Sequence, residues 1–348
     1  VRVSRNIPVF MYIQHRNDDF IALRKKFPQF SFDSFAIHHE KDKIDFAYSF
    51  SISDRYFFEP KIIIPIKPFF KIKELNPEHL NILAFHVGMI ELISYWKASC
   101  SPLIKIKPFQ LNADQIKWWK NLYYNGLGEF FYRNNIQVDS EDFVEIQCES
   151  QKDISSISFN GNEGYIIPIG GGKDSVVTLE LLKKLHLPLV PFIINPREAT
   201  TETARQAGFR DENVFTVYRT IHPLLLQLND QGFLNGHTPF SALLAFYTLL
   251  ASYISGIPRI ALSNESSANE STVAGTLINH QYSKSFQFEN DFRNYVHKYL
   301  DPGLNYFSFL RPLNELQIAG IFSRFPHYHS IFRSCNVGSK TNRWCGHC

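Results

Sequence analysis

The second half of the chain is organised as short apolar runs separated by amphipathic segments. Helices are predicted between these runs: one with an apolar face after the first run, a long apolar helix from Thr238-Pro239 to Gly256, and another from Asn314. Buried strands are predicted at residues 165–169, 189–194, 214–218, 259–263 and 306–310. Strands that alternate with helices indicate an α/β fold, a doubly wound parallel sheet whose ligands bind at the carboxyl ends of the strands.

The first half follows a different pattern. Apolar and polar residues alternate over residues 44–52, which predicts a half-buried strand, and residues 62–64 resemble another. Two helices are predicted, one capped by Asn76 and one that opens at Asn112. The polar stretch at residues 137–164 is interpreted as a connection. We therefore expect three parts: an N-terminal α+β region at residues 1–150, an α/β domain at 151–330 and a cysteine-rich tail at 331–348.

Composition narrows the class of protein. A length of 348 residues with 44% hydrophobic and 15% aromatic residues is typical of a globular chain with a large core. The net charge of +3 provides no strong field for a polyanion, so no nucleic-acid partner is expected. The longest apolar stretch, residues 242–257, is too short to span a bilayer, and no membrane contact is expected. The first residues lack the apolar segment of a secretory signal, so we expect a cytoplasmic protein.

The segment Gly170-Gly171-Gly172-Lys173-Asp174-Ser175 carries the most specific chemical signal. A triple glycine between a buried strand and a helix allows backbone N–H groups to approach phosphate oxygens, and the helix N-terminus adds partial positive charge. The segment is neither a Walker A loop nor a dinucleotide-binding Gly-x-Gly-x-x-Gly. It resembles the Ser-Gly-Gly-x-Asp-Ser signature of the PP-loop (N-type) ATP pyrophosphatases, which cleave ATP between the α and β phosphates.

This resemblance implies a role for each residue of the loop. The backbone of Gly171 and Gly172 and the Ser175 hydroxyl would cradle the pyrophosphate of ATP, and Asp174 would join through Mg²⁺. Gly170 stands where that family has its first serine, so one hydroxyl is missing, and Lys173 could supply charge in its place. A glycine-rich turn without a ligand is the structural alternative.

Other strand ends are predicted to meet the same site. In such enzymes adenine lies over the end of the second strand, which here is Ile194-Asn195. His237, at the start of the long helix, could bring a titratable imidazole to this face. The loop after the fourth strand suits a polar substrate or hydrated Mg²⁺, although an ordinary solvated loop is the alternative. Its candidate substrate-binding residues are Asn264, Glu265, Ser266, Asn269 and Glu270, and Glu265 is also a candidate catalytic residue.

Three of the five cysteines lie near the end of the sequence. Cys345 and Cys348 have the Cys-x-x-Cys spacing, and Cys335 precedes them, so the three could be ligands of a structural Zn²⁺. A redox dithiol is the alternative. Cys100 and Cys148 are isolated and are expected to be buried thiols.

Five segments of the chain together resemble one family of PP-loop enzymes. They are Tyr95-Trp96-Lys97-Ala98, residues 124–132, the glycine loop, residues 263–271 and residues 311–315. These segments are similar to the UDP-N-acetylmuramoyl-L-alanyl-L-glutamate epimerases of bacterial peptidoglycan synthesis. The resemblance runs from about residue 32 to residue 348.

The resemblance implies an isomerase that uses ATP and binds its substrate partly through the N-terminal region. It would invert the terminal L-glutamate of UDP-MurNAc-L-Ala-L-Glu to D-glutamate through an acyl-adenylate, with release of AMP and pyrophosphate. Candidate proton carriers are His237, His280 and Tyr282. Two other classes stay open: a PP-loop amidotransferase or thiolation enzyme acting on tRNA or a nucleobase, such as a 7-cyano-7-deazaguanine synthase, and a non-catalytic ATP-binding module.

Overall fold

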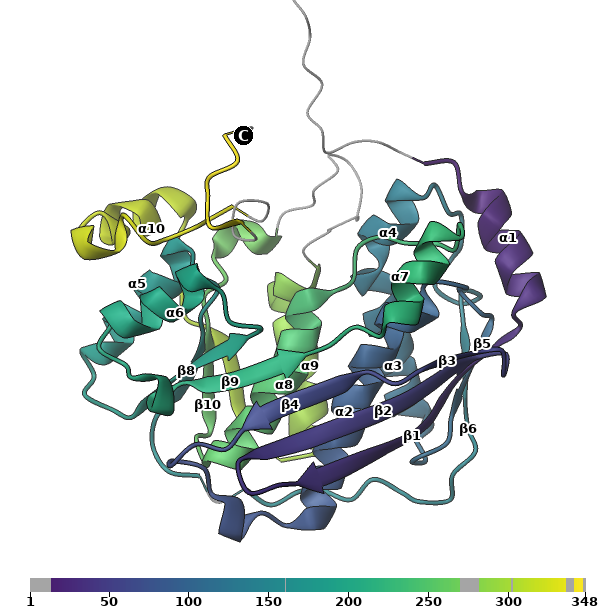
Figure 1. Ribbon diagram of the computed structural model, residues 1–348, viewed down its shortest axis with the longest axis horizontal. Coiled ribbons are helices and arrows are strands. Elements are labelled where there is room, and N and C mark those ends of the chain that lie inside the picture. The colour runs from purple at the N-terminus through teal and green to yellow at the C-terminus, as the bar shows by residue number, and fades with distance from the viewer. Residues whose placement is uncertain (1–13, 160, 270–281, 302, 336–340, 347–348) are drawn as a thin grey trace, which may run out of the picture.

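One mixed sheet runs through the whole molecule (Figure 1). The computed structural model describes residues 14–159, 161–269, 282–301, 303–335 and 341–346. Within them the strands are β1 (Gln29–His39), β2 (Lys43–Ile52), β3 (Tyr56–Phe58), β4 (Lys61–Pro65), β5 (Leu103–Ile106), β6 (Glu145–Cys148), β7 (Tyr165–Pro168), β8 (Leu189–Ile194), β9 (Phe215–Arg219), β10 (Arg259–Leu262) and β11 (Asn305–Ser308). Ten of them follow the order β11-β10-β7-β8-β9-β4-β2-β1-β5-β6, and β3 pairs with β2. The predicted α/β class is therefore confirmed.

Five strands form the parallel half of this sheet. Every neighbouring pair from β9 through β8, β7 and β10 to β11 is parallel. The chain enters at the central β7, moves outward to β8 and β9, and returns to β10 on the other side of β7. This reversal creates a switch point between β7 and β10, and ligand crevices form at such points, at the carboxyl ends of the strands.

The other half is built from the first 150 residues. Strands β1, β2, β3 and β4 are antiparallel to their neighbours within this group, whereas β5 and β6 extend β1 in parallel. Because β6 lies within residues 137–164, the interpretation of that whole stretch as a connection was wrong. Its polar ends obscured a four-residue strand in which Ile146 is buried against β5.

The two halves meet edge to edge. Strand β4 pairs antiparallel with β9, with Ile62 opposite Arg219 and Ile63 opposite Tyr218. The sheet is therefore continuous across residue 150, where the sequence pattern changes. The boundaries expected between the three parts of the chain remain predictions.

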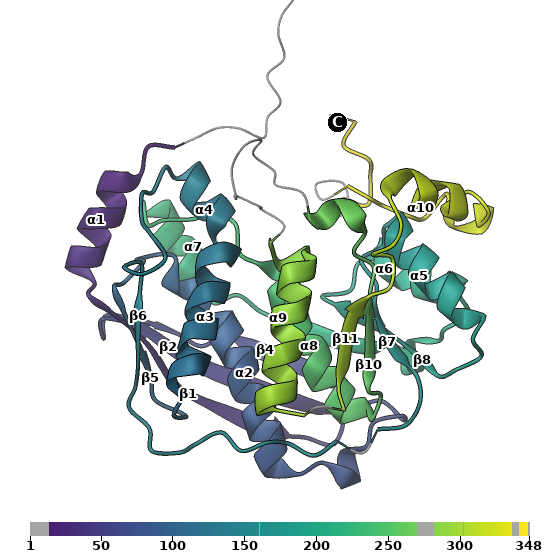
Figure 2. The ribbon, with the colours of Figure 1, turned by 180° about the vertical axis from the view of Figure 1, so that it is seen from behind.

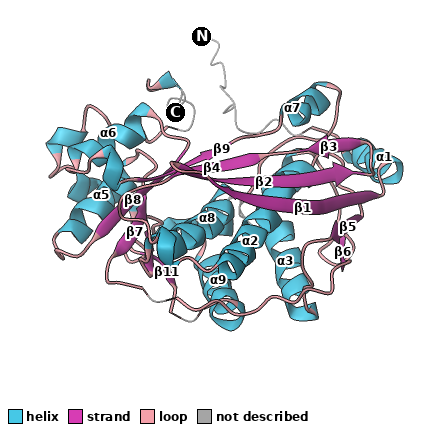
Figure 3. Ribbon diagram, turned by 60° about the horizontal axis from the view of Figure 1, so that its bottom comes forward, coloured by secondary structure: helices cyan, strands magenta, loops and turns pink. Residues whose placement is uncertain are grey.

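Helices cover both faces of the parallel half (Figures 1 and 3). They are α1 (Asn17–Lys26), α2 (Pro77–Trp96), α3 (Ala113–Gly126), α4 (Gly128–Arg133), α5 (Lys173–Lys183), α6 (Glu198–Gln206), α7 (Pro223–Asp230), α8 (Phe240–Ser255), α9 (Phe286–Tyr299) and α10 (Glu315–Phe322). Helices α5, α6 and α10 lie on one face, and α8 and α9 lie on the other. Because α2 packs on β1, β2 and α8, one helical layer spans both halves of the sheet, as Figure 2 shows from behind.

A large core lies between the sheet and this helical layer. It joins residues of both halves, such as Trp96 and Phe246, in one cluster. A smaller core beneath α5 and α10 contains Val176 and Ile318. Trp119 is fully buried in the large core, and the half-buried Trp118 packs against the same core.

Most predicted helix ends are confirmed. The side chains of Asn76 and Asn112 accept hydrogen bonds from the first turns of α2 and α3, and Gly256 ends α8 with a φ of 74°. The start of α8 differs from the expectation, because Thr238 does not cap it. The Thr238 hydroxyl accepts a hydrogen bond from Lys97 instead.

Candidate active site

Two loops border the switch point of the parallel strands. One follows β7 and contains the triple glycine, and the other follows β10 and contains residues 263–269. Because β7 and β10 are adjacent and parallel, both loops leave the sheet at the same edge. The structure thus brings together the two loops that carry most of the predicted site residues.

The glycine loop is shaped by two close approaches. Gly171 has a φ of +80°, and a Cβ on it would lie 3.0 Å from the Cβ of Ala199. A Cβ on Gly172, the N-cap of α5, would lie 3.0 Å from the Ser334 Oγ. Gly170 has open space around it, which is where a phosphate could approach the backbone.

The charged side chains of the loop are paired with one another. The Lys173 ammonium lies 2.8 Å from the Asp174 carboxylate and 2.8 Å from that of Glu315 in α10. Partial burial opposes the charge, but the two carboxylates outweigh it, so the pKa of Lys173 is raised. The Ser175 hydroxyl donates to the Gly172 carbonyl at 2.9 Å. Lys173 therefore remains an ammonium near neutral pH, close in sequence to the open space at Gly170.

The tail of the chain lies on the glycine loop, which the sequence did not indicate. The backbone N–H of Arg333 donates to the Gly171 carbonyl at 2.7 Å. The Ser334 hydroxyl accepts from the backbone N–H of Lys173 at 3.3 Å. A serine hydroxyl thus reaches a loop in which Gly170 replaces a serine. The two segments are about 160 residues apart in sequence, and no local pattern relates them.

A cavity of about 320 Å³ opens beside the glycine loop. Gly170 lines one side, Ile194 and Asn195 at the end of β8 line another, and Phe240 and Leu244 from the first turns of α8 line a third. Largely apolar walls with a few polar groups are typical of small-molecule sites. The three predicted nucleotide-binding positions at Gly170, Ile194 and Asn195 therefore surround one space.

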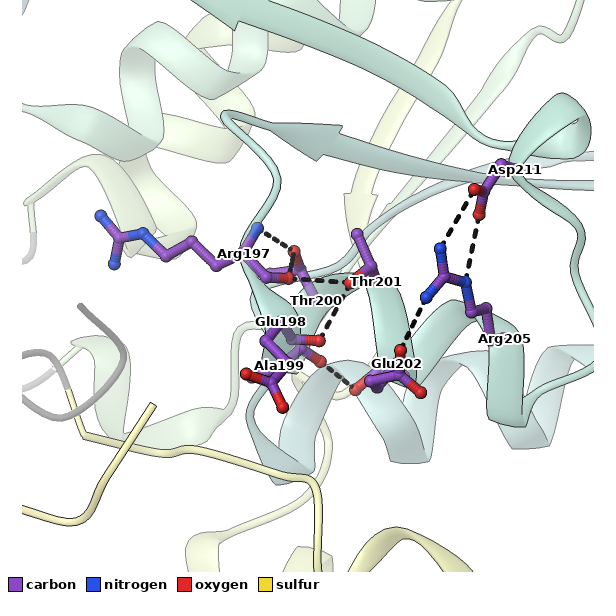
Figure 4. Close-up of polar contacts among 9 residues, drawn as sticks. Arg197, Glu198, Ala199, Thr200, Thr201, Glu202, Arg205 and Asp211 are labelled. Atoms are coloured by element: carbon purple, nitrogen blue, oxygen red, sulfur yellow. Dashed lines mark hydrogen bonds and ion pairs between the residues drawn. The ribbon is translucent and has the colours of Figure 1, made fainter. Parts of the chain in front are cut away.

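Arg197 also lines this cavity and was missed by the sequence analysis. The Thr200 hydroxyl accepts from the Arg197 N–H at 2.9 Å and donates to the Arg197 carbonyl at 2.7 Å, which fixes this backbone at the start of α6. The Arg197 side chain extends away from α6 (Figure 4), whereas Arg205 pairs with Glu202 and Asp211 farther along the chain. The residue type was a signal that the sequence already held, because arginine is over-represented where proteins bind phosphate.

Beneath the cavity, Asn195 is held by a buried ion pair. It has a φ of 48° and exchanges hydrogen bonds with the backbone of Arg219, at 2.8 and 3.0 Å. The Arg219 guanidinium forks onto the buried Glu91 at 2.6 and 2.8 Å, and the Tyr247 hydroxyl donates to the same carboxylate at 2.6 Å. Burial alone would lower the pKa of Arg219, but Glu91 raises it overall, so the Arg219 guanidinium stays charged and its fixed position holds Asn195.

Several polar groups of the loop after β10 form hydrogen bonds with other groups of the protein. The Asn264 amide donates to the Ser308 hydroxyl at 3.0 Å, and the Ser267 hydroxyl donates to Glu265 at 2.6 Å. The Ser266 N–H donates to a backbone carbonyl, and the Asn269 side chain contacts the start of α9. Glu270, the last predicted residue of this loop, lies outside the described residues.

Three buried polar atoms around this loop lack a hydrogen-bond partner among the residues that the structure describes. They are the Ser263 Oγ, the Glu265 Oε2 and the Arg311 Nε. Other nitrogens of Arg311 donate to the Glu265 carbonyl at 3.0 Å and to the Lys284 carbonyl at 2.7 Å. Because buried polar atoms are normally paired, this cluster indicates a place for a polar ligand.

The start of α8 is held by residues of the N-terminal half. Lys97 donates to the carbonyl of Gly236 at 2.5 Å and to the Thr238 hydroxyl at 2.8 Å. The His237 Nδ1 lies 3.2 Å from the Glu129 carboxylate. Two motifs that sequence analysis could not explain, around Lys97 and Glu129, thus converge on residues 236–238, next to the α8 turn that lines the cavity.

The other two candidate proton carriers are His280 and Tyr282. His280 lies outside the described residues. Tyr282 is buried, its hydroxyl accepts from the Asn121 amide at 3.4 Å, and burial raises its pKa. A phenol with a raised pKa is a poor base near neutrality, so Tyr282 is better explained as part of the core.

Two cysteines of the tail lie side by side. The Sγ atoms of Cys335 and Cys345 are 3.4 Å apart, close to the roughly 3.8 Å expected between two thiolates on one tetrahedral Zn²⁺. Cys348 lies outside the described residues, among which no group of three or more His, Cys, Asp or Glu side chains could hold a metal. Cys100 is fully buried and Cys148 is half-buried.

Comparison with known proteins gives a consistent picture. The family described as the MurL N-terminal domain matches residues 22–309. A curated relative from Xanthomonas oryzae pv. oryzae (strain MAFF 311018), named UDP-N-acetyl-alpha-D-muramoyl-L-alanyl-L-glutamate epimerase, is 33% identical over 268 residues, which are 75% of this chain and 58% of the relative. Relatives with the same name from Micromonospora sp. (strain ATCC 39149 / NRRL 15099 / SCC 1413) and from Salinispora tropica (strain ATCC BAA-916 / DSM 44818 / JCM 13857 / NBRC 105044 / CNB-440) are each 31% identical over 74% of this chain.

The chain spans 58%, 58% and 56% of the lengths of these three relatives, a little more than half. Across the described parts of the chain, no helix is long and apolar enough to cross a membrane. The family match nevertheless covers most of the sequence. The chain therefore belongs to the family of the MurL N-terminal domain, and the resemblance to the UDP-N-acetylmuramoyl-L-alanyl-L-glutamate epimerases that its motifs indicated is confirmed.

Proposed function

We propose that the chain carries the ATP-dependent epimerisation of UDP-MurNAc-L-Ala-L-Glu to the D-glutamate epimer, in peptidoglycan precursor synthesis in the cytoplasm. The observation that carries the proposal is the glycine loop at the switch point, which shares one cavity with Ile194, Asn195 and Arg197. An anion-binding loop joined to a largely apolar cavity suits a nucleoside triphosphate.

In this proposal ATP is a substrate of a PP-loop site. Its phosphates lie at Gly170, Gly171 and Gly172, with Lys173, Ser175 and Arg197 as further donors, and its adenine lies between Ile194 and Phe240. Asp174 and the unpaired oxygen of Glu265 are hard oxygen donors that suit Mg²⁺, which binds through a few carboxylates and the phosphates themselves. Bound there, Mg²⁺ would neutralise charge on the phosphates.

The chemistry proceeds by activation of the glutamate carboxylate. A carboxylate oxygen attacks the α-phosphorus of ATP, the bond to the β-phosphate oxygen breaks, and pyrophosphate leaves. The resulting acyl-adenylate is neutral at the carbonyl, so its α-hydrogen is far more acidic than that of a free carboxylate. A base removes this proton, an acid returns one to the opposite face, and water cleaves the acyl–phosphate bond to release AMP and the D-epimer.

His237 is the proton carrier that the structure best supports. The Glu129 carboxylate at its Nδ1 favours the tautomer with the proton on that nitrogen, so Nε2 becomes the basic one. Lys97 acts as a positioning residue, because it holds the segment on both sides of His237. The polar loop after β10, with Asn264, Ser266 and Asn269, would bind the peptide end of the substrate.

The test is solvent exchange at the glutamate α-carbon. The 348-residue chain is incubated with UDP-MurNAc-L-Ala-L-Glu, ATP and Mg²⁺ in D₂O, and we expect deuterium at that carbon as D-glutamate and pyrophosphate appear. Exchange should require ATP, and an analogue with a nonhydrolysable α,β link should block it. Asp174→Ala and Ser175→Ala should each abolish pyrophosphate release, because a charge-assisted contact contributes about 1.5–3 kcal/mol and more in the transition state.

Three results would contradict the proposal. Epimerisation without ATP would mean that the glycine loop has been misassigned. Pyrophosphate release with transfer of nitrogen or sulfur, and no D-glutamate, would favour an amidotransferase or thiolation enzyme. ATP binding without pyrophosphate release on any precursor would favour a non-catalytic module.

A further inference from the structure

A second cavity of about 410 Å³ shares no lining residue with the cavity beside the glycine loop. Its walls come from the segment before α1, from the end of α4, from α7 and from the loop that leads into α8. In Figures 1 and 2, helices α1, α4 and α7 gather on one side of the molecule, and α5, α6 and α10 gather on the other. Neither the motifs nor the proposed ATP site accounts for this cavity.

This cavity borders the segment that carries the proposed proton carrier. Gly236, which lines it, immediately precedes His237 and is held by Lys97. Arg133, which also lines it, lies 3.5 Å from the same Glu129 carboxylate that contacts His237. A ligand that fills the cavity would therefore end next to the proposed proton carrier.

The lining chemistry is cationic and rich in amides. Two arginines, Arg16 and Arg133, face one exposed acid, Asp230. Asn134, Asn229 and Asn235 supply amide groups, and Phe233 supplies an aromatic wall. Part of the charge of Arg16 is balanced by Asp19, whereas the Arg133 side chain is 45% exposed and paired only loosely. Such a lining suits an anion that carries hydrogen-bonding groups and a flat ring.

One atom in the lining points to a specific need. The Oδ1 of Asn229 is buried and has no hydrogen-bond partner within the described ranges. An unpaired buried acceptor is unfavourable unless a ligand or an ordered water donates to it. The imide N–H of uracil is such a donor, and a phosphate oxygen is not.

We propose that this cavity binds the uridine diphosphate end of the substrate, an inference that rests on the proposed function. The substrate is long, with the reacting glutamate at one end and uridine diphosphate at the other, so its two ends need separate sites. In this arrangement Arg16 and Arg133 hold the diphosphate, Asn229 accepts from the uridine, and the sugar and peptide run past residues 236–238 toward the glycine loop. A volume of about 410 Å³ is in the range of pockets for ligands of this size.

The experiment measures binding of UDP itself by calorimetry, without ATP, to the 348-residue chain. We expect Arg133→Ala and Asn229→Ala each to weaken UDP binding by about tenfold or more, since each removes a contact to the ligand. The matched control is Arg210→Ala, because Arg210 is a 79% exposed arginine paired with Glu212 outside this cavity. Thermal unfolding should be unchanged in Asn229→Ala, because its carbonyl oxygen has no partner to lose.

Competition distinguishes uridine recognition from a general phosphate site. ADP and inorganic diphosphate should displace UDP only weakly, because neither carries the imide N–H of uracil. If both displace it as well as UDP does, or if UDP fails to bind, or binds equally to all variants, the proposal is overturned. None of these results depends on turnover, so the deuterium-exchange test of the proposed function stands or fails separately.

Discussion

Lys97 places a positive charge where few residues could carry one. Its side chain is almost fully buried at the end of α2, and both of its hydrogen bonds go to the segment that leads into α8. Burial lowers the pKa of Lys97 to about 8, and the nearby charge of Arg219 contributes in the same direction, whereas Cys100 opposes it. A neutral amine keeps two N–H donors, so both hydrogen bonds survive deprotonation.

This lowered pKa predicts a pH-dependent stability. Between about pH 8 and the ordinary lysine value of 10.5, the unfolded chain binds a proton at Lys97 that the folded chain does not, so stability rises with pH in that window. Relative to Lys97→Met, the wild type should gain on the order of 2–3 kcal/mol from pH 7 to pH 10. Thermal unfolding of both proteins across this range measures the gain.

The matched control for this measurement is Lys184→Met, because Lys184 is an exposed lysine at the end of α5. Its difference from the wild type should stay constant with pH. If the Lys97→Met difference is equally constant, the ammonium is solvated well enough to titrate normally, and its role in holding residues 236–238 is only that of a hydrogen-bond donor.

Single residues of the site were predictable where their chemistry is local. The triple glycine, Asp174 and Ser175 are contiguous between a strand and a helix, so their neighbourhood follows from the sequence. The roles of Lys97 and Ser334 were not predictable, because each acts on a segment more than 130 residues away. No periodicity or spacing records such a contact.

At the scale of elements, the start of α8 connects the ATP cavity to the N-terminal half of the chain. Its first turns line the ATP cavity through Phe240 and Leu244. Pro239 packs against Gly126, the last residue of α3. The position of α8 therefore depends on where α3 ends and on how closely its last residue approaches Pro239. Helix α3 belongs to the N-terminal half.

Two glycines of one motif test the contact between α3 and the start of α8. A Cβ on Gly126 would lie 2.8 Å from the Cγ of Pro239, whereas a Cβ on Gly128 meets nothing within 4 Å. Gly126→Ala should destabilise the protein by about 1–3 kcal/mol through overpacking and should slow deuterium exchange. Gly128→Ala, at the start of α4, should be neutral or slightly stabilising. Equal thermal midpoints for the two variants would show that α8 does not rest on Gly126.

The elements themselves were predicted unevenly, for a physical reason. All five strands of the parallel half were found within one or two residues, because buried parallel strands are continuous apolar runs between turn residues. Strands β1, β5 and β6 were missed because they mix polar residues into their sequences, and β3 was missed because it is only three residues long. The pairing of β4 with β9 was not predictable, because either strand could pair along its free edge with several partners and nothing local in the sequence selects one.

At the scale of the whole molecule, the tail connects the end of the described chain to the nucleotide loop. It folds back on itself: Phe332 packs against Trp344, the Arg333 side chain donates to the Asn342 carbonyl at 3.2 Å, and Cys335 meets Cys345. The same segment lies on Gly171 and Gly172 through its backbone and Ser334. Whatever fixes the two cysteines thus also fixes the contacts of Arg333 and Ser334 with the glycine loop.

We therefore predict that the tail binds zinc and that the metal supports ATP binding. A preparation of the 348-residue chain should contain about one equivalent of Zn²⁺, and Cys345→Ser should lose it together with thermal stability. ATP affinity should fall with it, because the hydrogen bonds of Arg333 and Ser334 to the loop depend on the folded tail. Cys148→Ser, at a half-buried thiol outside the tail, is the control and should retain metal and affinity. A metal-free protein in which Cys345→Ser binds ATP as the wild type does would leave these thiols without a structural role, and the tail contacts would have to be stabilised by the packing of Phe332 and Trp344 alone.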